Sequence, residues 1–193
     1  MVQHNSIDHS ALLSVSYASN STSVSFTSAA GASTLVSRAD HVHKQRTFHG
    51  VRAIPNAGTV MTTANTEYPI AFAGVDTYDT DAFHDPASNN TRITIPAGLA
   101  GYYVFTAMLY VPITAGTTNY LDLKFRLGGA AGTVIAQARD NPAGDGNPIM
   151  QLVSAPYSLA AGNYVELYAM TNVASRTTDS TTAWFAAQLV GIT

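Results

Sequence analysis

The sequence contains no cysteine, and only 11% of its 193 residues are charged, against roughly a quarter in an ordinary soluble domain. Without cysteine, neither a disulfide framework nor a thiolate metal site is available. Nine basic residues against twelve acidic ones give a net charge of −3, which argues against nucleic acid as a partner. The apolar runs fall far short of the roughly 20 residues of a membrane span, and the first residues lack the pattern of a signal peptide. We therefore expect no membrane insertion.

Apolar residues make up 46% of the chain, which is enough to build a folded core. They are distributed unevenly, because eleven serines lie between Ser6 and Ser37 and five of the six histidines precede Gly50. Large apolar residues and tyrosines dominate the rest. We therefore predict an N-terminal arm over residues 1–49 and a folded domain over residues 50–193.

The arm is too short and too polar to fold alone, because it buries too little apolar area to offset its ordering entropy. Serine alternates with apolar residues over 14–17 and again over 23–26. This period of two predicts short strands with one solvent-exposed face. Two alternatives stay open: a disordered serine-rich tail, or an arm that becomes ordered by pairing with its own copies or with a larger assembly.

The second segment is predicted to be all-β. Strands are expected over 92–95, 103–111, 120–127, 133–138, 164–170 and 183–192, separated by turns rich in glycine, proline and asparagine. Along 120–127, Leu121, Leu123, Phe125 and Leu127 alternate with charged residues, which predicts one buried and one exposed face. Eight to ten such strands indicate an antiparallel sandwich, and a jelly roll of about ten strands is the usual way to close one.

The order of short motifs in this segment resembles the globular head of complement C-one-q, which belongs to the tumour-necrosis-factor superfamily of jelly rolls. The motifs are Ile70–Phe72, Tyr78-Asp79 with Phe83, Ile93–Pro96, Gly101–Phe105, Leu159–Leu167 and Trp184–Gly191. The resemblance covers roughly residues 50–193. It implies a ten-stranded jelly roll that assembles as a homotrimer through flat apolar and aromatic faces. Asp79 to Phe83 lacks the family's glycine before the aromatic residue, which leaves the shape of that loop open.

Residues 102–105 carry bulky side chains on both faces of one predicted strand. A single two-layer sandwich would leave one face exposed, whereas a subunit interface would cover it. We therefore predict that Tyr102, Val104 and Trp184 lie in a trimer interface; the alternative for Tyr102 and Val104 is burial under a loop. The low charge fits the same interpretation, with charged residues on outward loops and strand faces and the uncharged surface between subunits.

A second resemblance lies in the arm. Residues 31–43, GASTLVSRADHVH, resemble a motif recurrent in bacteriophage tail-fibre and other virion fibre proteins, and residues 7–12 resemble another phage-fibre element. In some of these fibres the His-x-His pairs of three chains coordinate one axial metal ion, which implies such a site at His41 and His43, with Asp40 orienting an imidazole.

The geometry of such a site is sound, because residues two apart in an extended chain point the same way. Three chains would supply six imidazoles, which favours iron or nickel over tetrahedral zinc. The alternative is that His41 and His43 cap or pack in a turn with Asp40.

An acidic cluster consists of Asp76, Asp79, Asp81 and Asp85, beside His84. Paired carboxylates are the groups of glycosidases, and loop carboxylates bind calcium. The glycine of a calcium loop is absent, because Ala82 follows the series, so a solvated turn that satisfies backbone N–H groups is the expected role. The loop that holds Asp140 and Asp145 leaves the same choice between ligand contact, calcium binding and a plain loop.

Together these features predict a structural virion protein of a bacteriophage, a homotrimeric fibre, spike or capsid-decoration protein and not an enzyme. It would be made in the host cytoplasm and displayed on the virion exterior. Residues 1–49 would attach it to other virion proteins of the capsid, collar or tail, and the knob would bind a host-surface molecule, with a glycan expected. The alternatives are a tailspike-like glycan-degrading enzyme, which lacks its repetitive scaffold and carboxylate pair here, and a secreted bacterial adhesion module, which lacks its signal peptide.

Overall fold

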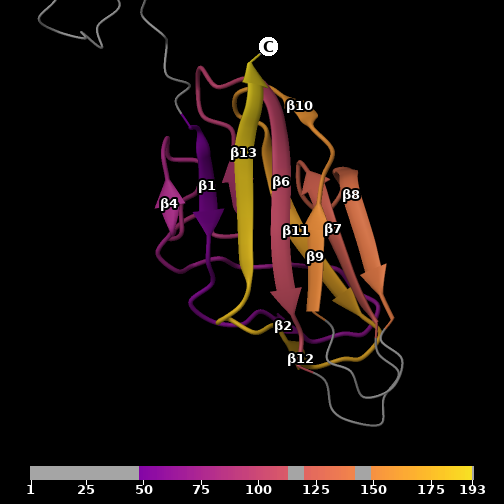
Figure 1. Cartoon of the computed structure of the whole chain (residues 1–193). Coiled ribbons are helices and arrows are strands. Elements are labelled where there is room, and N and C mark those ends of the chain that lie inside the picture. The colour runs from indigo at the N-terminus through magenta and orange to yellow at the C-terminus, as the bar shows by residue number, and fades with distance from the viewer. Residues whose placement is uncertain (1–47, 113–119, 142–148, 193) are drawn as a thin grey trace, which may run out of the picture. The chain divides into compact units, whose positions relative to one another are not determined.

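The computed structural model describes residues 48–112, 120–141 and 149–192, and the structural statements below concern these residues. They form two antiparallel β-sheets packed face to face and a two-stranded ribbon at one end (Figure 1). This confirms the predicted antiparallel all-β sandwich. No helix in the described ranges has the length and apolarity needed to cross a membrane.

The first sheet faces the viewer in Figure 1 and has the strand order β10-β6-β13-β1-β4, with β9 also paired to β6. β9 pairs with the second half of β6 and β10 with its start, so this edge of β6 has a strand partner along most of its length. The strands are β1 (Gly50–Ala53), β4 (Tyr78–Asp79), β6 (Gly101–Tyr110), β9 (Ile149–Val153), β10 (Tyr157–Leu159) and β13 (Trp184–Ile192).

The second sheet lies behind the first in Figure 1 and has the order β3-β11-β7-β8, with β5 also paired to β11. Its strands are β3 (Tyr68–Pro69), β5 (Arg92–Thr94), β7 (Leu121–Leu127), β8 (Thr133–Asp140) and β11 (Tyr164–Thr171). The ribbon pairs β2 (Val60–Met61) with β12 (Arg176–Thr177).

The core lies between the two sheets and is built from alternate residues of the long strands. Phe105, Phe125 and Phe185 come from β6, β7 and β13 and are fully buried, with ring centroids 5.5 to 6.1 Å apart. Burial of each such ring stabilises the fold by about 1.5–3 kcal/mol. These three rings therefore join the two sheets at the centre of the sandwich.

All six predicted strands are present, with ends that differ by at most two residues from the prediction. The described residues contain thirteen strands, more than the eight to ten expected, because several are pairings of only two or three residues. Leu121, Leu123 and Phe125 are buried as predicted, whereas Leu127 at the end of β7 is only partly buried.

The loop after β4 contains a residue with a positive φ, a backbone conformation usually adopted by glycine, but the residue there is Ala82. Ala82 has a φ of +59°, the left-handed region that L-residues seldom occupy. The carboxylate of Asp79 accepts N–H hydrogen bonds from Asp81, Phe83 and His84 at 2.9 to 3.3 Å, and these bonds hold the turn. The turn delivers Phe83 into the core, where its ring centroid lies 6.0 Å from that of Tyr103.

We predict that Ala82→Gly raises the free energy of unfolding by about 0.5–1 kcal/mol. Glycine relieves the left-handed backbone strain of alanine, which is roughly 1–2 kcal/mol. This gain exceeds the about 0.5–1 kcal/mol that the greater unfolded-state entropy of glycine costs. Ala138→Gly, in the extended backbone of β8, is the control and should lower stability. Chemical denaturation of both variants measures the change, and a destabilised Ala82→Gly would contradict the assignment of strain to this turn.

Candidate functional site

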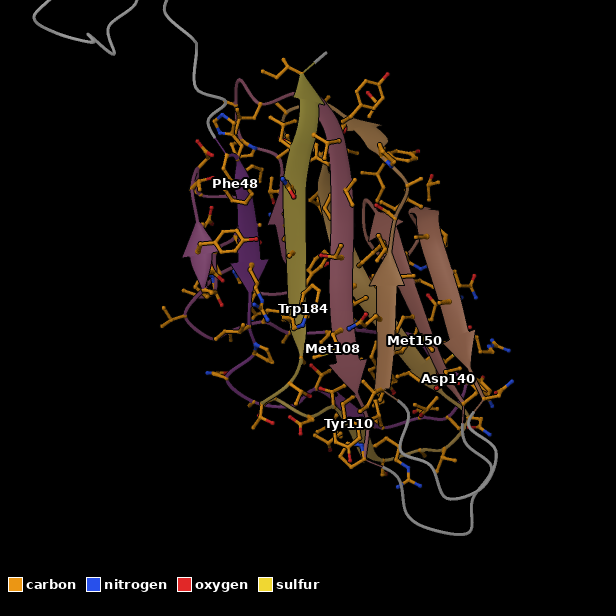
Figure 2. The ribbon with its side chains drawn as sticks, in the orientation of Figure 1. Phe48, Met108, Tyr110, Asp140, Met150 and Trp184 are labelled. Carbon is orange, nitrogen blue, oxygen red and sulfur yellow. The ribbon has the colours of Figure 1, made fainter. Side chains whose placement is uncertain are left out.

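The outer face of the first sheet carries almost no charge, and we call it the apolar face. Cross-strand register places its residues in rows across β9, β6 and β13. Figure 2 shows Trp184 and Met108 side by side near the start of β13 and the end of β6. The face consists of Tyr102, Val104, Thr106, Met108, Tyr110, Ile149, Gln151, Val153, Trp184, Ala186 and Gln188.

Much of the apolar face is open to solvent in a single copy. Ile149 is 63% exposed, Val153 61% and Tyr102 47%. Large contiguous apolar patches are uncommon on monomeric soluble proteins and mark interaction sites. All three residues predicted for the trimer interface lie on this face, with Tyr102 exposed and Val104 and Trp184 half-buried, so no described loop covers Tyr102.

Aromatic residues and one arginine extend the apolar face across β1 and β4. Phe48 and Tyr78 meet edge to face with ring centroids 5.4 Å apart. The guanidinium of Arg52 lies 5.0 Å from the ring centroid of Trp184, a favourable cation–π position. Arg52 is the one charged side chain that the strands of the described first sheet direct to this face.

The sequence motifs did not identify the contribution of β9 to this face. Residues 149–153, IMQLV, bury Met150 and Leu152 in the core and expose Ile149 and Val153 on the other side. Apolar residues on both faces are the same feature that identified Tyr102 and Val104. The run is only five residues long and follows a glycine-rich loop, so its strand character is weak in the sequence.

The outer face of the second sheet has the opposite character, and we call it the charged face. Glu67 bridges two of its cations: it accepts hydrogen bonds from Lys124 Nζ and, at 2.8 Å, from Arg126 Nε. Burial raises the pKa of Glu67, but these hydrogen bonds and charges outweigh it and hold the pKa below its usual value. The strands direct six charged side chains to this face, namely Arg92, Asp122, Lys124, Arg126, Arg139 and Glu166.

Asp122 corrects the prediction that the charged residues of this strand are exposed, because it is 1% exposed. It does face away from the core, but Arg139 donates two hydrogen bonds to Oδ2 at 2.7 and 3.0 Å, and Gln137 donates to both oxygens. The Arg139 guanidinium also lies 4.3 Å from the ring centroid of Tyr120. These long side chains lie over the carboxylate and exclude solvent from it.

Glu166 is the second buried carboxylate of the charged face. It accepts a hydrogen bond from Thr91 Oγ1 at 2.6 Å and another from the Tyr168 hydroxyl at 2.8 Å. Burial, together with the bond to Glu166, raises the pKa of Tyr168 above its usual value. Both groups therefore have the partners that buried polar atoms require, whereas Nε of Arg92 on the same face is buried without a hydrogen-bond partner among the described residues.

The predicted acidic cluster does not converge on a common point, because each carboxylate has its own protein partner. Asp76 accepts from Nδ1 of His84 and Asp81 from Nδ1 of His49, both at 2.8 Å. Burial raises the pKa of Asp76 despite the nearby imidazole. The hydrogen bonds from Thr80 and His49 lower the pKa of Asp81.

The remaining predicted site residues are placed as follows. Asp85 accepts N–H hydrogen bonds from Ala87 and Ser88 within its own turn, and Asp140 ends β8. The described residues hold no group of three or more His, Cys, Asp or Glu side chains placed to bind a metal ion. The predictions for Asp40, His41, His43 and Asp145 lie outside the described residues.

We predict that Glu67→Gln lowers stability by about 1 kcal/mol or less at neutral pH, because it removes the charge shared by Lys124 and Arg126. The folded-state pKa of Glu67 is lowered, so its contribution is present above the ordinary value of 4.5 and is lost as the pH falls through the folded value. Chemical denaturation at several pH values from 7 to 3 measures the free energy of unfolding of both proteins. The difference between Glu67→Gln and the parent should become smaller as the pH falls. A difference independent of pH would contradict this account.

No protein-family model and no curated protein matches this sequence. The fold is similar to the globular domain of a zebrafish complement 1qA protein (13% identity, 75% of this chain and 98% of that chain, TM-score 0.51). It is also similar to Eiger TNF from S. frugiperda (10% identity, 77% of this chain and 96% of that chain, TM-score 0.51). A third similar structure is murine APRIL (7% identity, 75% of this chain and 100% of that chain, TM-score 0.55). The chain therefore has the complement- and tumour-necrosis-factor-like jelly-roll fold that its motifs predicted.

Proposed function

We propose that the protein is a homotrimeric, non-enzymatic binding protein in which the apolar face of each copy packs against its neighbours. One observation carries this proposal: the apolar face has a single charged side chain, Arg52, whereas the strands of the charged face present six. Depletion of charge and enrichment of aromatic residues distinguish the core of a protein–protein interface from the rest of a surface. The charged face would then point to solvent.

A closed ring of three copies would account for the low charge of the chain, because the surface buried between copies needs no charged residues to keep it in water. In a closed ring each copy uses two different patches, so the apolar face of one copy is covered by the next and no copy is left with an open patch. A monomer would keep Ile149, Val153 and Tyr102 in water. The resemblance to trimeric jelly rolls supports three as the number of copies.

The contacts of the acidic cluster support a binding protein over an enzyme. A glycosidase needs two carboxylates that flank one bond. Here Asp79 and Asp85 accept hydrogen bonds from backbone N–H groups. Asp76 and Asp81 accept hydrogen bonds from histidine side chains. Their contacts are those of side chains that shape loops.

The virion role rests on the arm. The resemblance of residues 31–43 to phage-fibre proteins supports attachment of residues 1–49 to a capsid, collar or tail, with the jelly roll on the virion exterior. The charged face, with its ordered tyrosines and arginines, would then be the surface offered to a host-surface glycan or protein. The same motif supports a transition-metal ion on the trimer axis, held by His41 and His43.

We predict a mass in solution close to three times the 20.3 kDa of one chain, measured by light scattering after size-exclusion chromatography. Val104→Asp should dissociate the assembly, because three carboxylates would be buried in apolar surroundings without partners.

Val134→Asp is the matched control, since Val134 lies on β8 beside Arg126 on the charged face and is 39% exposed. This variant should keep the parent mass. A monomeric parent, or equal behaviour of the two variants, would contradict the proposal.

We also predict one iron or nickel ion for three chains of purified full-length protein, measured by elemental analysis. His41→Ala/His43→Ala should lose this metal and lower the melting temperature, because the metal stabilises the state that binds it. His4→Ala/His9→Ala, which removes two histidines elsewhere in the arm, should do neither. Metal-free parent protein, or metal retained by the His41/His43 variant, would contradict the axial site.

A further inference from the structure

Arg52 has no carboxylate partner among the residues that the structure describes. Its guanidinium contacts the indole of Trp184, and its Nε is buried without a hydrogen-bond partner among the described residues. Arg126 and Arg139, on the charged face, each bind a carboxylate directly. If the apolar face is covered in an assembly, Arg52 is removed from water, and a buried guanidinium needs an acceptor.

The described residues leave one carboxylate for this role. Five carboxylates accept hydrogen bonds from side chains, namely Glu67, Asp76, Asp81, Asp122 and Glu166. Three others accept hydrogen bonds from backbone N–H groups, namely Asp79, Asp85 and Asp179. The side-chain carboxylate of Asp140 makes no hydrogen bond or ion pair with another described residue. Asp140 is the last residue of β8, which lies beside β9 at the edge of the apolar face.

Arg52 lies on the β1 side of the first sheet, whereas Asp140 lies on β8 of the second sheet, next to the β9 side of the first, and both are towards the same end. Arg52 is on β1 and stacks over Trp184, the first residue of β13. Figure 2 shows Asp140 at the lower end of β8, near Met150 of β9 and on the side away from β1. The exposed Ile149 and Val153 occupy that same flank.

In a closed ring the contact between copies joins two different patches. The aromatic flank at β1 and β4 and the aliphatic flank at β9 are the two patches that the apolar face offers. A threefold axis roughly parallel to the strands brings one flank of a copy against the other flank of the next. Residues at the same end of the sheet then lie at the same level.

We infer that Arg52 of each copy binds the carboxylate of Asp140 in the neighbouring copy, which gives one ion pair at each of three interfaces. The inference rests on the proposed trimer. Each guanidinium would lie between the Trp184 indole of its own chain and the neighbour's carboxylate. Such a pair fixes the register and orientation of two apolar patches, which dispersion contacts alone specify poorly.

Charge reversal tests the pair by sedimentation equilibrium of the full-length protein over a range of concentrations. Arg52→Glu and Asp140→Arg each place like charges together and should raise the concentration at half-dissociation by roughly tenfold or more. The double variant restores opposite charges and should return to within about threefold of the parent, the non-additivity expected of contacting residues. Arg92→Glu is the matched control, because Arg92 also stacks on an aromatic ring, that of Tyr164 on the charged face.

Cross-linking provides a second readout that does not depend on stability. The parent has no cysteine, so Arg52→Cys/Asp140→Cys carries the only two thiols, and a short bis-maleimide should join copies into dimers and trimers on a denaturing gel. Arg92→Cys/Asp140→Cys should remain monomeric under the same treatment.

The outcomes separate the two claims. A trimeric parent whose Arg52→Glu and Asp140→Arg variants behave like Arg92→Glu, or whose Arg52→Cys/Asp140→Cys variant does not cross-link, overturns the ion pair and leaves the trimer standing. A monomeric parent overturns both. Rescue by the double reversal together with cross-linking supports the pair.

Discussion

Two long strands of the first sheet, β6 and β13, carry apolar side chains on both of their faces. One face of β6 supplies Tyr103, Phe105 and Leu109 to the core, and the other presents Tyr102 and Val104 outward. A two-layer sandwich covers only the first of these faces. The hydrophobic effect therefore favours a second covering layer, and the chain can supply it with another copy of itself.

The distribution of charge follows from the same constraint. Carboxylates and arginines that would be costly at an interface are gathered on the second sheet, where Glu67, Asp122 and Glu166 bind partners within the chain. If another copy covers the apolar face, only one of the two broad faces must be soluble, and the chain then needs few charged residues. Arg52 is the exception, because it lies on the apolar face and has no carboxylate partner within the described part of the chain.

The sequence predicted the sandwich well because β7 alternates strictly between apolar and charged residues and glycine-containing turns separate the long strands. It did not predict β9, whose five residues give a weak pattern, or the burial of Asp122, which depends on side chains that reach it from β8. The shape of the loop at Ala82 was left open by the sequence; the structure places Ala82 in the left-handed region, where three N–H hydrogen bonds to Asp79 offset the strain. Contacts across strands cannot be read from local spacing, so the apolar face was anticipated only through Tyr102, Val104 and Trp184.

The central claim is that other copies of the chain cover the apolar face, and the single tryptophan reports on it directly. Trp184 lies on that face beside Met108. Quenching of its fluorescence by acrylamide, measured over a range of protein concentrations, should be weak at high concentration and rise on dilution as the copies separate. Quenching that is strong and unchanged at every concentration would show that Trp184 is never covered and would contradict the account.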